Sequence, residues 1–170
     1  MELPEEAQPT LPRSARIGLD VGKARIGVAA SDPDGLLAMP VETVRRGPGD
    51  LKRIGEIIAE RNASFCYIGL PKHLKGGEGE SAQDARGFAK RLANLLAKSG
   101  ANIGVNYIDE RLTTVTATSQ LSQAGRKTNR HRAVIDQQAA VIILQSALDT
   151  ERISGARAGL PYQSSDRGTR

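Results

Sequence analysis

The chain has 170 residues, of which 39% are hydrophobic and 25% charged, a composition typical of one water-soluble globular domain with a single sizeable core. No apolar run approaches the roughly 20 residues of a membrane-spanning helix, and the single cysteine, Cys66, excludes an internal disulfide and a cysteine-based metal site. The net charge of +5 weakly favours a polyanionic partner such as nucleic acid.

Both ends of the chain are predicted to lie outside the folded domain. Residues 1–14 form an acidic, proline-containing arm without the apolar core of a signal peptide, so we expect a cytoplasmic protein that does not engage a membrane. Residues 154–170 are rich in glycine, serine and arginine and predict a disordered tail. The folded domain is therefore expected to span residues 15–153.

The first part of this domain is rich in strand signals. The segments "ARIGLDVG" and "RIGVAASD" predict two strands joined by a glycine-containing turn, and "PVETVRR" predicts a third strand beside them. The segment "DLKRIGEIIAER" carries its aliphatic residues at helical spacing and predicts a helix. We expect the three strands to form an antiparallel unit.

The second part alternates strands with helices. The almost wholly apolar "SFCYIGLP" is typical of a strand buried on both faces, and a glycine-rich loop, "KHLKGGEGE", follows it. Residues 81–98 predict an amphipathic helix, "ANIGVNYIDERLT" predicts a strand, and a basic loop, "GRKTNRHR", separates helices predicted over 114–124 and 133–153. The order predicts an α/β fold with a mixed five-stranded sheet, three antiparallel strands then two parallel ones, and helices on both faces.

Four carboxylates lie at the boundaries of apolar elements. Asp20 sits inside a strand-forming run, where an unpaired buried charge is costly. Asp109 and Glu110 end a later strand, at the sheet edge where α/β proteins bind ligands. Asp136 shares a face of the last predicted helix with apolar residues that must pack on the sheet.

Each of these acids also has a purely structural interpretation. Asp20 could pair with a buried arginine or cap a turn, Asp109 or Glu110 could pair with Arg111, and Asp136 could be favoured by the helix dipole. If three of them converge, their repulsion calls for a divalent cation. Oxygen donors without a histidine or cysteine cluster favour Mg²⁺ or Mn²⁺ over zinc.

Four motifs of the sequence resemble one known family, the YqgF (RuvX-like) family of the RNase H-like superfamily. They are "GLDVGKARIGVAASD", "IGLP" with its glycine-rich loop, "DERLTT" and "DQQAAVIILQ", which occur in the family's order over about residues 16–148. The resemblance implies an RNase H-like sheet whose first and fourth strands are neighbours. Asp20 would then lie close to Glu110, and the last helix would bring in Asp136.

The activity implied by the resemblance is metal-dependent hydrolysis of nucleic-acid phosphodiester bonds, by an endonuclease that matures the 5′ end of pre-16S rRNA in ribosome biogenesis. The alternative is a Holliday junction resolvase in recombination and repair, for which cutting two strands symmetrically calls for a homodimer. Two Mg²⁺ or Mn²⁺ ions about 3.5–4 Å apart would suit the chemistry. Asp20 would bridge both, Glu110 and Asp136 would each hold one, and Asp109 would pair with a cation instead.

Two features depart from the family pattern. The loop "KHLKGGEGESA" is more basic than the "LNMDG" type of the family, and Gln137, Gln138 and Ala139 follow Asp136 where RuvC resolvases carry a second acid on the last helix. The metal site could therefore have one carboxylate fewer than that of RuvC.

Basic residues are expected to hold the phosphates of the substrate, with strong salt dependence and little reading of base sequence. The candidates lie in the first hairpin, the glycine-rich loop and the basic loop before the last helix: Lys23, Arg25, Lys72, Lys75, Arg126, Lys127, Arg130 and Arg132. Solvated loop residues are the structural alternative for the last two groups.

Two rival functions remain at this point. The motif "GLDVG" followed by "RIGVA" also resembles the phosphate-binding hairpin of actin-like ATPases and sugar kinases, but those proteins need two such lobes and a second phosphate motif that the sequence does not contain. A non-catalytic RNA-binding module of the same fold is the second rival, and the presence of all three acids weakens it.

Overall fold

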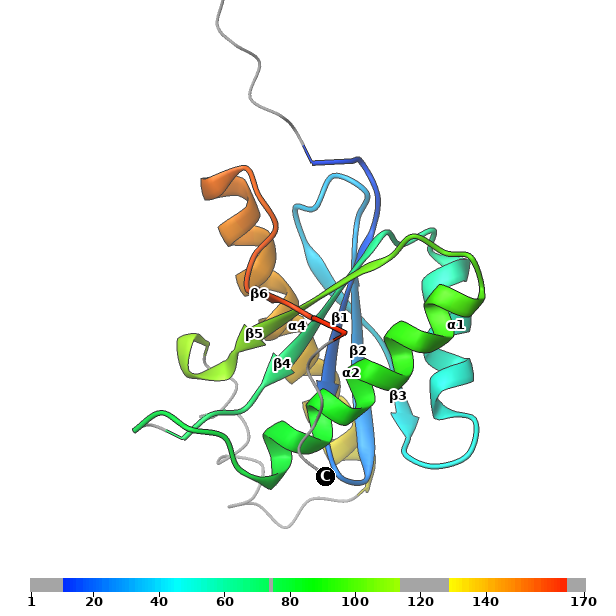
Figure 1. The fold of residues 1–170 in the computed structure, drawn as a ribbon, viewed down its shortest axis with the longest axis vertical. Helices are drawn as coiled ribbons and strands as arrows, with labels where there is room; N and C mark the ends of the chain where they lie inside the picture. Colours follow the sequence, from blue (N-terminus) through cyan, green and yellow to red (C-terminus); the bar gives the residue numbers. More distant parts are fainter. Residues whose placement is uncertain (1–10, 74, 114–128, 165–170) are drawn as a thin grey trace, which may run out of the picture.

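A mixed six-stranded sheet forms the centre of the molecule (Figure 1). The structure is a computed structural model that describes residues 11–73, 75–113 and 129–164. The strands lie in the order β3-β2-β1-β4-β5-β6, with β1, β2 and β3 antiparallel and β4 and β5 parallel to β1. Their bounds are β1 Arg16–Val21, β2 Arg25–Ser31, β3 Ala38–Arg45, β4 Phe65–Leu70, β5 Gly104–Asp109 and β6 Leu160–Pro161.

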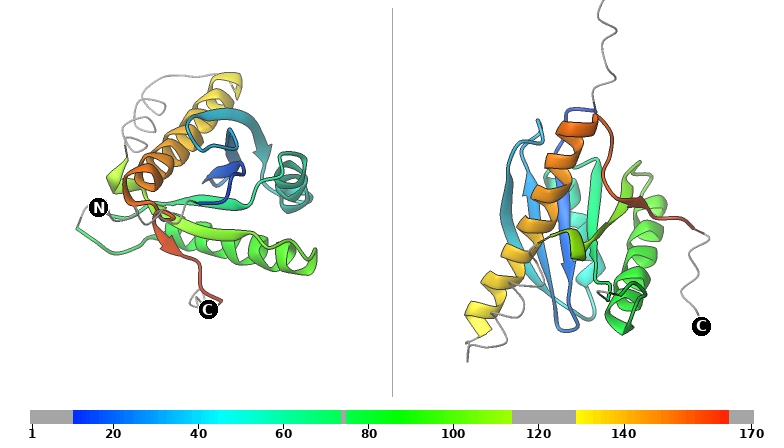
Figure 2. Two further views of the ribbon diagram at one scale, coloured as in Figure 1. Left: turned by 90° about the horizontal axis from the view of Figure 1, so that it is seen from above. Right: turned by 90° about the vertical axis from the view of Figure 1, so that its left-hand side faces the viewer.

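Helices cover both faces of this sheet (Figure 2). Helices α1 (Asp50–Glu60) and α2 (Glu80–Lys98) pack on one face, and the long helix α4 (Asn129–Ser154) crosses β1, β2, β3 and β4 on the other. A short 3₁₀ helix, η1 (Glu110–Leu112), follows β5. The mixed sheet with helices on both faces is therefore confirmed. In the described part of the chain no helix is long and apolar enough to cross a membrane.

Two details differ from the sequence-based prediction. A sixth strand, β6, pairs antiparallel with β5, so the sheet has one strand more than the five expected. The segment that carries it was predicted to be part of a disordered tail, yet the backbone N–H of Tyr162 donates to Val105 O at 2.8 Å and the amide of Asn106 donates to Ala158 O at 2.6 Å. The helix predicted over residues 114–124 lies outside the described residues.

Alternation along β1 separates two cores. Ile17, Leu19 and Val21 are buried under α1 and α2, whereas the intervening positions of β1 face α4. The same alternation buries Cys66 on the α1 and α2 side, where desolvation raises the pKa of its thiol to about 12. Cys66 is therefore an inert core residue.

Helix α4 packs closely against the sheet where positions beneath it lack side chains. A Cβ atom added to Gly27 would lie 1.9 Å from the carbonyl oxygen of Asp136, and one added to Gly18 would lie 2.6 Å from Leu144 Cβ. A Cβ atom on Gly69 would lie 2.5 Å from Ile143 Cδ1. The helix backbone thus rests on bare backbone of β1 and β2, and Gly69 of β4 leaves room for the side chain of Ile143.

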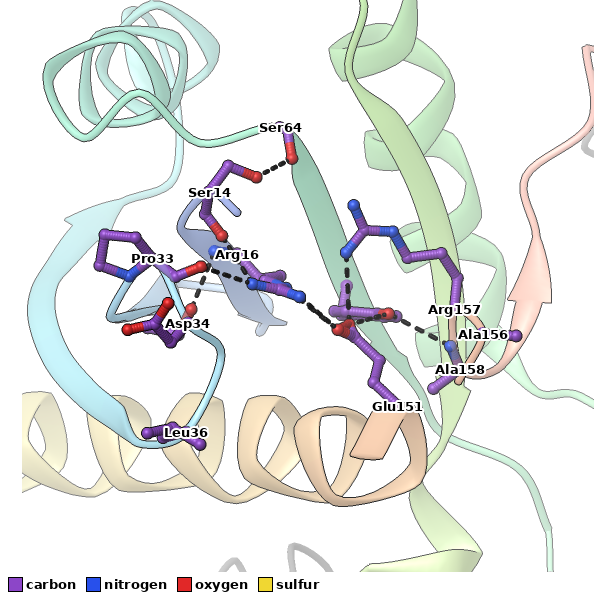
Figure 3. A network of polar contacts seen from close by, with 12 residues as sticks. Ser14, Arg16, Pro33, Asp34, Leu36, Ser64, Glu151, Ala156, Arg157 and Ala158 are labelled. Carbon is purple, nitrogen blue, oxygen red and sulfur yellow. Dashed lines mark hydrogen bonds and ion pairs between the residues drawn. The ribbon is translucent and has the colours of Figure 1, made fainter. Parts of the chain in front are cut away.

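A buried polar network fixes the C-terminal part of α4 (Figure 3). The Arg16 guanidinium donates to Glu151 Oε1 at 3.0 Å, and Tyr67 OH donates to Glu151 Oε2 at 2.7 Å. The N–H of Ala158 in turn donates to Tyr67 OH at 3.2 Å. Arg16 and Glu151 are each only 4% exposed, so the pair is screened from water and links β1, β4, α4 and the segment before β6.

The substitution Gly27→Ala tests the close approach of α4. The added methyl group would overlap the backbone at Asp136, so we expect the free energy of unfolding to fall by about 1–3 kcal/mol. Urea denaturation measures the change. The control is Gly87→Ala in α2, where no atom lies within 4 Å of the added Cβ, and where alanine should stabilise the helix by up to about 1 kcal/mol. Equal effects of the two variants would contradict the close packing.

The substitution Glu151→Ala tests the buried network. It leaves the Arg16 guanidinium buried without its carboxylate, so the free energy of unfolding should fall by about 3–5 kcal/mol. Its control is Asp149→Ala on the same helix, where the Asp149–Arg152 pair is about half exposed and should contribute less than about 1 kcal/mol. Thermal and urea unfolding of both variants give the comparison, and similar losses would argue against a special role for Glu151.

Candidate active site

The first acid of the site, Asp20, lies near the end of β1 on the face covered by α4. Its neighbour across the antiparallel pair is Gly27, the position on which the backbone of Asp136 rests. The missing side chain at Gly27 therefore brings the α4 turn that carries Asp136 next to Asp20. The charge of Asp136 acts on Asp20 directly and raises its pKa.

The second acid, Glu110, reaches the same place from the other side of β4. It follows the last residue of β5 and begins η1, whose first turn is capped when Asp109 Oδ1 accepts the backbone N–H of Arg111 at 3.0 Å. A Cβ atom added to Gly69 would lie 2.7 Å from Glu110 Oε1. The bare backbone of β4 thus leaves room for this carboxylate between β5 and β1, which are not themselves neighbours.

Asp20 and Glu110 form an uncompensated acidic pair. Desolvation by burial, and then the charge of Asp136, raises the pKa of Asp20 to about 7. Desolvation, followed by the charges of Asp20 and Asp109, raises the pKa of Glu110 to about 7. Among the described residues, hydrogen bonds that would stabilise either ionised carboxylate do not contribute to these shifts. The site favours a positive charge that the described residues do not supply.

Asp109 behaves differently from its neighbour. Arg111 Nη2 donates to Asp109 Oδ2 at 2.7 Å, and this hydrogen bond lowers the pKa of Asp109. The prediction that Asp109 pairs with a nearby cation is confirmed.

Asp136 has a cationic partner that sequence reasoning missed. Arg25 Nε donates to Asp136 Oδ2 at 2.8 Å, with the two side chains 28% and 25% exposed. Arg25 lies two residues before Gly27 on β2, so its side chain shares the face on which α4 rests. The sequence carried no signal for a pair whose members lie 111 positions apart.

The donor atoms of the three acids suit a divalent cation, whereas the arrangement of their side chains suits it less well. All their donors are oxygens, and Asp20 and Glu110 repel each other at a half-buried position. Within residues 11–73, 75–113 and 129–164, however, no three acidic, histidine or cysteine side chains are grouped as metal ligands. Asp20 and Glu110 are suited to hold a cation as they stand, whereas Asp136 is engaged by Arg25.

Of the predicted basic residues, Arg25 pairs with Asp136, and the others fall into three groups. Lys23 lies in the β1–β2 turn, at the same sheet edge as Asp20, with Nζ 3.7 Å from Glu80 Oε1 and both side chains exposed. Lys72 follows β4 and borders a pocket that also includes Asp109, and Lys75 is exposed in the glycine-rich loop. The remaining predictions lie outside the described side chains: Arg126, Lys127, Arg130 and Arg132.

Comparison with known proteins gives one family for nearly the whole domain. The family model described as "RuvX: Holliday junction resolvase" matches residues 14–150. A relative from Nocardioides sp., named "Putative pre-16S rRNA nuclease", is 54% identical over 85% of this chain and 93% of its own length. A Streptomyces coelicolor protein of the same name is 48% identical over 94% of this chain and 96% of its own length.

Solved structures support the same fold at lower similarity. RuvC of T. thermophilus, solved in complex with a Holliday junction substrate, matches 87% of this chain and 99% of its own, with a TM-score of 0.52 and 16% identity. At that identity the likeness concerns the fold, which is that of RuvC and the RNase H-like proteins. With the family model covering most of the chain and relatives near 50% identity, this protein belongs to the RuvX family.

Proposed function

We propose that this protein is a divalent-metal-dependent endonuclease that hydrolyses a phosphodiester bond while processing the 5′ end of pre-16S rRNA. The observation that carries the proposal is the half-buried pair of Asp20 and Glu110, without a described counter-charge and with Asp136 beside it. Strongly raised carboxylate pKa values at a sheet edge are typical of functional sites. The names of the relatives from Nocardioides and Streptomyces support RNA processing as the task.

Asp20 takes the central role in this site. Its pKa responds to the charge of Asp136, and the pKa of Glu110 responds to the charge of Asp20. Asp20, Glu110 and Asp136 would together hold the Mg²⁺ or Mn²⁺ ions, with Asp20, the acid coupled to both of the others, as their common ligand. Such ions would supply an activated water and neutralise the leaving oxygen. The protein contributes the spacing of the three acids and a site partly shielded from water.

The basic residues around the site would hold the substrate backbone. Lys23 and Lys72 lie at the sheet edge that carries Asp20 and Glu110, and Lys75 extends the positive charge along the loop. Arg126, Lys127, Arg130 and Arg132 remain predictions for the same role. Contacts of this kind position a strand without reading its sequence, so binding should weaken steeply with salt.

A Holliday junction is the second candidate substrate, because the matching family model is described as a Holliday junction resolvase. A symmetric cut of a four-way junction would require two copies of the site, and therefore a homodimer. Cleavage of pre-rRNA requires one. The two substrates can be compared in a single assay.

The substitution Asp20→Asn tests catalysis. Loss of the shared ligand should lower the cleavage rate at least about a hundredfold, while the fold remains intact because a half-buried repulsive charge has been removed. Purified protein with Mn²⁺ or Mg²⁺ would receive an RNA carrying the pre-16S 5′ region and, separately, a four-way DNA junction.

The matched control is Asp34→Asn, whose carboxylate is exposed and pairs with Arg13, and which should cleave like the unmodified protein. Cleavage that survives in Asp20→Asn would refute the assignment of Asp20. Tight binding of either substrate without Asp20-dependent cleavage would favour the non-catalytic RNA-binding module.

The stability of the metal-free protein should depend on pH through the same acids. Folding raises the pKa of Asp20 and Glu110 to about 7 from the ordinary 3.8 and 4.5, so the folded state holds protons that the unfolded state releases. The resulting stabilisation is complete below about pH 4 and is lost as pH rises through about 7. Between pH 5.5 and 8 the free energy of unfolding should fall by about 1 kcal/mol or more, lowering Tm by about 2–4 °C per kcal/mol.

Thermal unfolding in EDTA, and then with added Mg²⁺ or Mn²⁺, measures this dependence. The cation should restore stability at pH 8, where both acids are ionised, more than at pH 5.5. Asp20→Asn should flatten both the pH dependence and the metal effect. A pH profile shared by the unmodified protein and this variant would show that the acids are not coupled as described.

A further inference from the structure

The ion pair of Arg25 and Asp136 occupies the third carboxylate of the proposed metal site. Arg25 Nε is 2.8 Å from Asp136 Oδ2, and both side chains are partly open to solvent. Asp20 and Glu110 have no such partner among the described residues, so the internal cation neutralises one acid of the three. A metal ion that uses the same oxygen must displace the guanidinium.

A cleft lies beside this ion pair, and Arg25 is one of its lining residues. The cleft, about 420 Å³, is lined by Ala24, Arg25, Thr43, Arg45 and Ala133. It contains two arginines and no acidic residue among these lining positions. Arg25 and Arg45 are direct partners in the β2–β3 register, so their like charges lie side by side on one face of the sheet and repel.

The chemistry of the cleft fits a phosphate group. Two guanidinium forks can take the oxygens of one phosphate in paired hydrogen bonds. Arg45 is exposed, and in the described part of the chain the structure shows no ion pair that would occupy it. The hydroxyl of Thr43 already donates to Ala133 O at 2.7 Å and accepts from Gln137 Nε2 at 3.0 Å, so the arginines are the groups available to a ligand.

We infer that Arg25 exchanges partners: it holds Asp136 while the metal site is empty, and it joins Arg45 in binding a backbone phosphate of the nucleic acid when Asp136 turns to the metal. The inference rests on the proposed function. It adds Arg45 to the substrate-binding residues, and it places the substrate strand along the β2–β3 side of the site. Metal and nucleic acid should then strengthen each other's binding, because each draws one member of the pair away from the other.

Calorimetric titration with Mn²⁺, in the absence of nucleic acid, tests the first half of the exchange. Arg25→Gln frees Asp136 and removes a positive charge beside it, so the variant should bind Mn²⁺ about 3–10-fold more tightly than the unmodified protein. Arg45→Gln makes the same change of charge without touching Asp136 and should alter Mn²⁺ affinity by less than about twofold. A purely structural role for Arg25 would leave Mn²⁺ affinity unchanged or lower it.

Binding of a single-stranded RNA in EDTA tests the second half without any metal. Affinities would be measured by fluorescence anisotropy for the unmodified protein, Arg25→Gln, Asp136→Asn and the double variant. Once Asp136 no longer holds Arg25, the loss caused by Arg25→Gln should be about 3–10-fold larger than in the unmodified background. Arg45→Gln should weaken RNA binding in both backgrounds and reduce the salt dependence by about one contact.

The outcomes separate this inference from the proposed function. If the unmodified protein binds Mn²⁺ and Arg25→Gln binds it no better, the exchange is refuted while the nuclease proposal stands. If Mn²⁺ does not bind at all, the nuclease proposal fails. In the RNA-binding experiment, additive effects of Arg25→Gln and Asp136→Asn would refute the exchange. Should Arg25→Gln fail to fold, Arg25→Lys provides the same test, because its ion pair is weaker and lacks the planar fork.

Discussion

The whole site depends on how closely helix α4 approaches the sheet. Side chains at positions 18 and 27 would hold the helix away, and glycine at both lets it rest on backbone atoms, while Gly69 leaves room for the side chains of Ile143 and Glu110. The contact at Gly27 has the most direct consequence, because it presses the turn that carries Asp136 against the strand partner of Asp20. One steric constraint therefore sets the packing of the α4 face and the distance between two of the acids.

The buried contacts that hold helix α4 on the sheet lie near one end of that helix, and the acid of the proposed metal site lies near the other. Glu151 is bound to Arg16 and Tyr67 at the C-terminal end, deep in the interior. Asp136 lies fifteen residues earlier, or about 22 Å along the helix axis, at a partly open position. The buried network can fix the helix on the sheet without involving the acids. The acidic end is then free to carry charges that repel one another, with Arg25 as the cation that the described residues supply there.

Much of the site could be predicted from short stretches of sequence. Asp20 stood out because a carboxylate interrupted the run of apolar residues and glycine that follows Arg16, and Glu110 because it followed a buried strand at its carboxyl end. Asp109 was expected to pair with a cation, and it does so with Arg111. These inferences work because strand periodicity and strand ends are local properties of the chain. Strand β6 escaped prediction because its two residues, Leu160 and Pro161, gain order only by pairing with β5.

The sequence by itself determined the order of the first five strands and of helices α1, α2 and α4, the apolar faces and the three acids, since each of these follows from residues within about ten positions of one another. Only the tertiary structure decided which groups those acids contact. The pairing of Arg25 with Asp136, the buried bond of Arg16 to Glu151, and the passage of Glu110 over Gly69 all join distant parts of the chain. Such contacts depend on strand order and on the path of α4 across the sheet, and these are settled by packing of the whole domain.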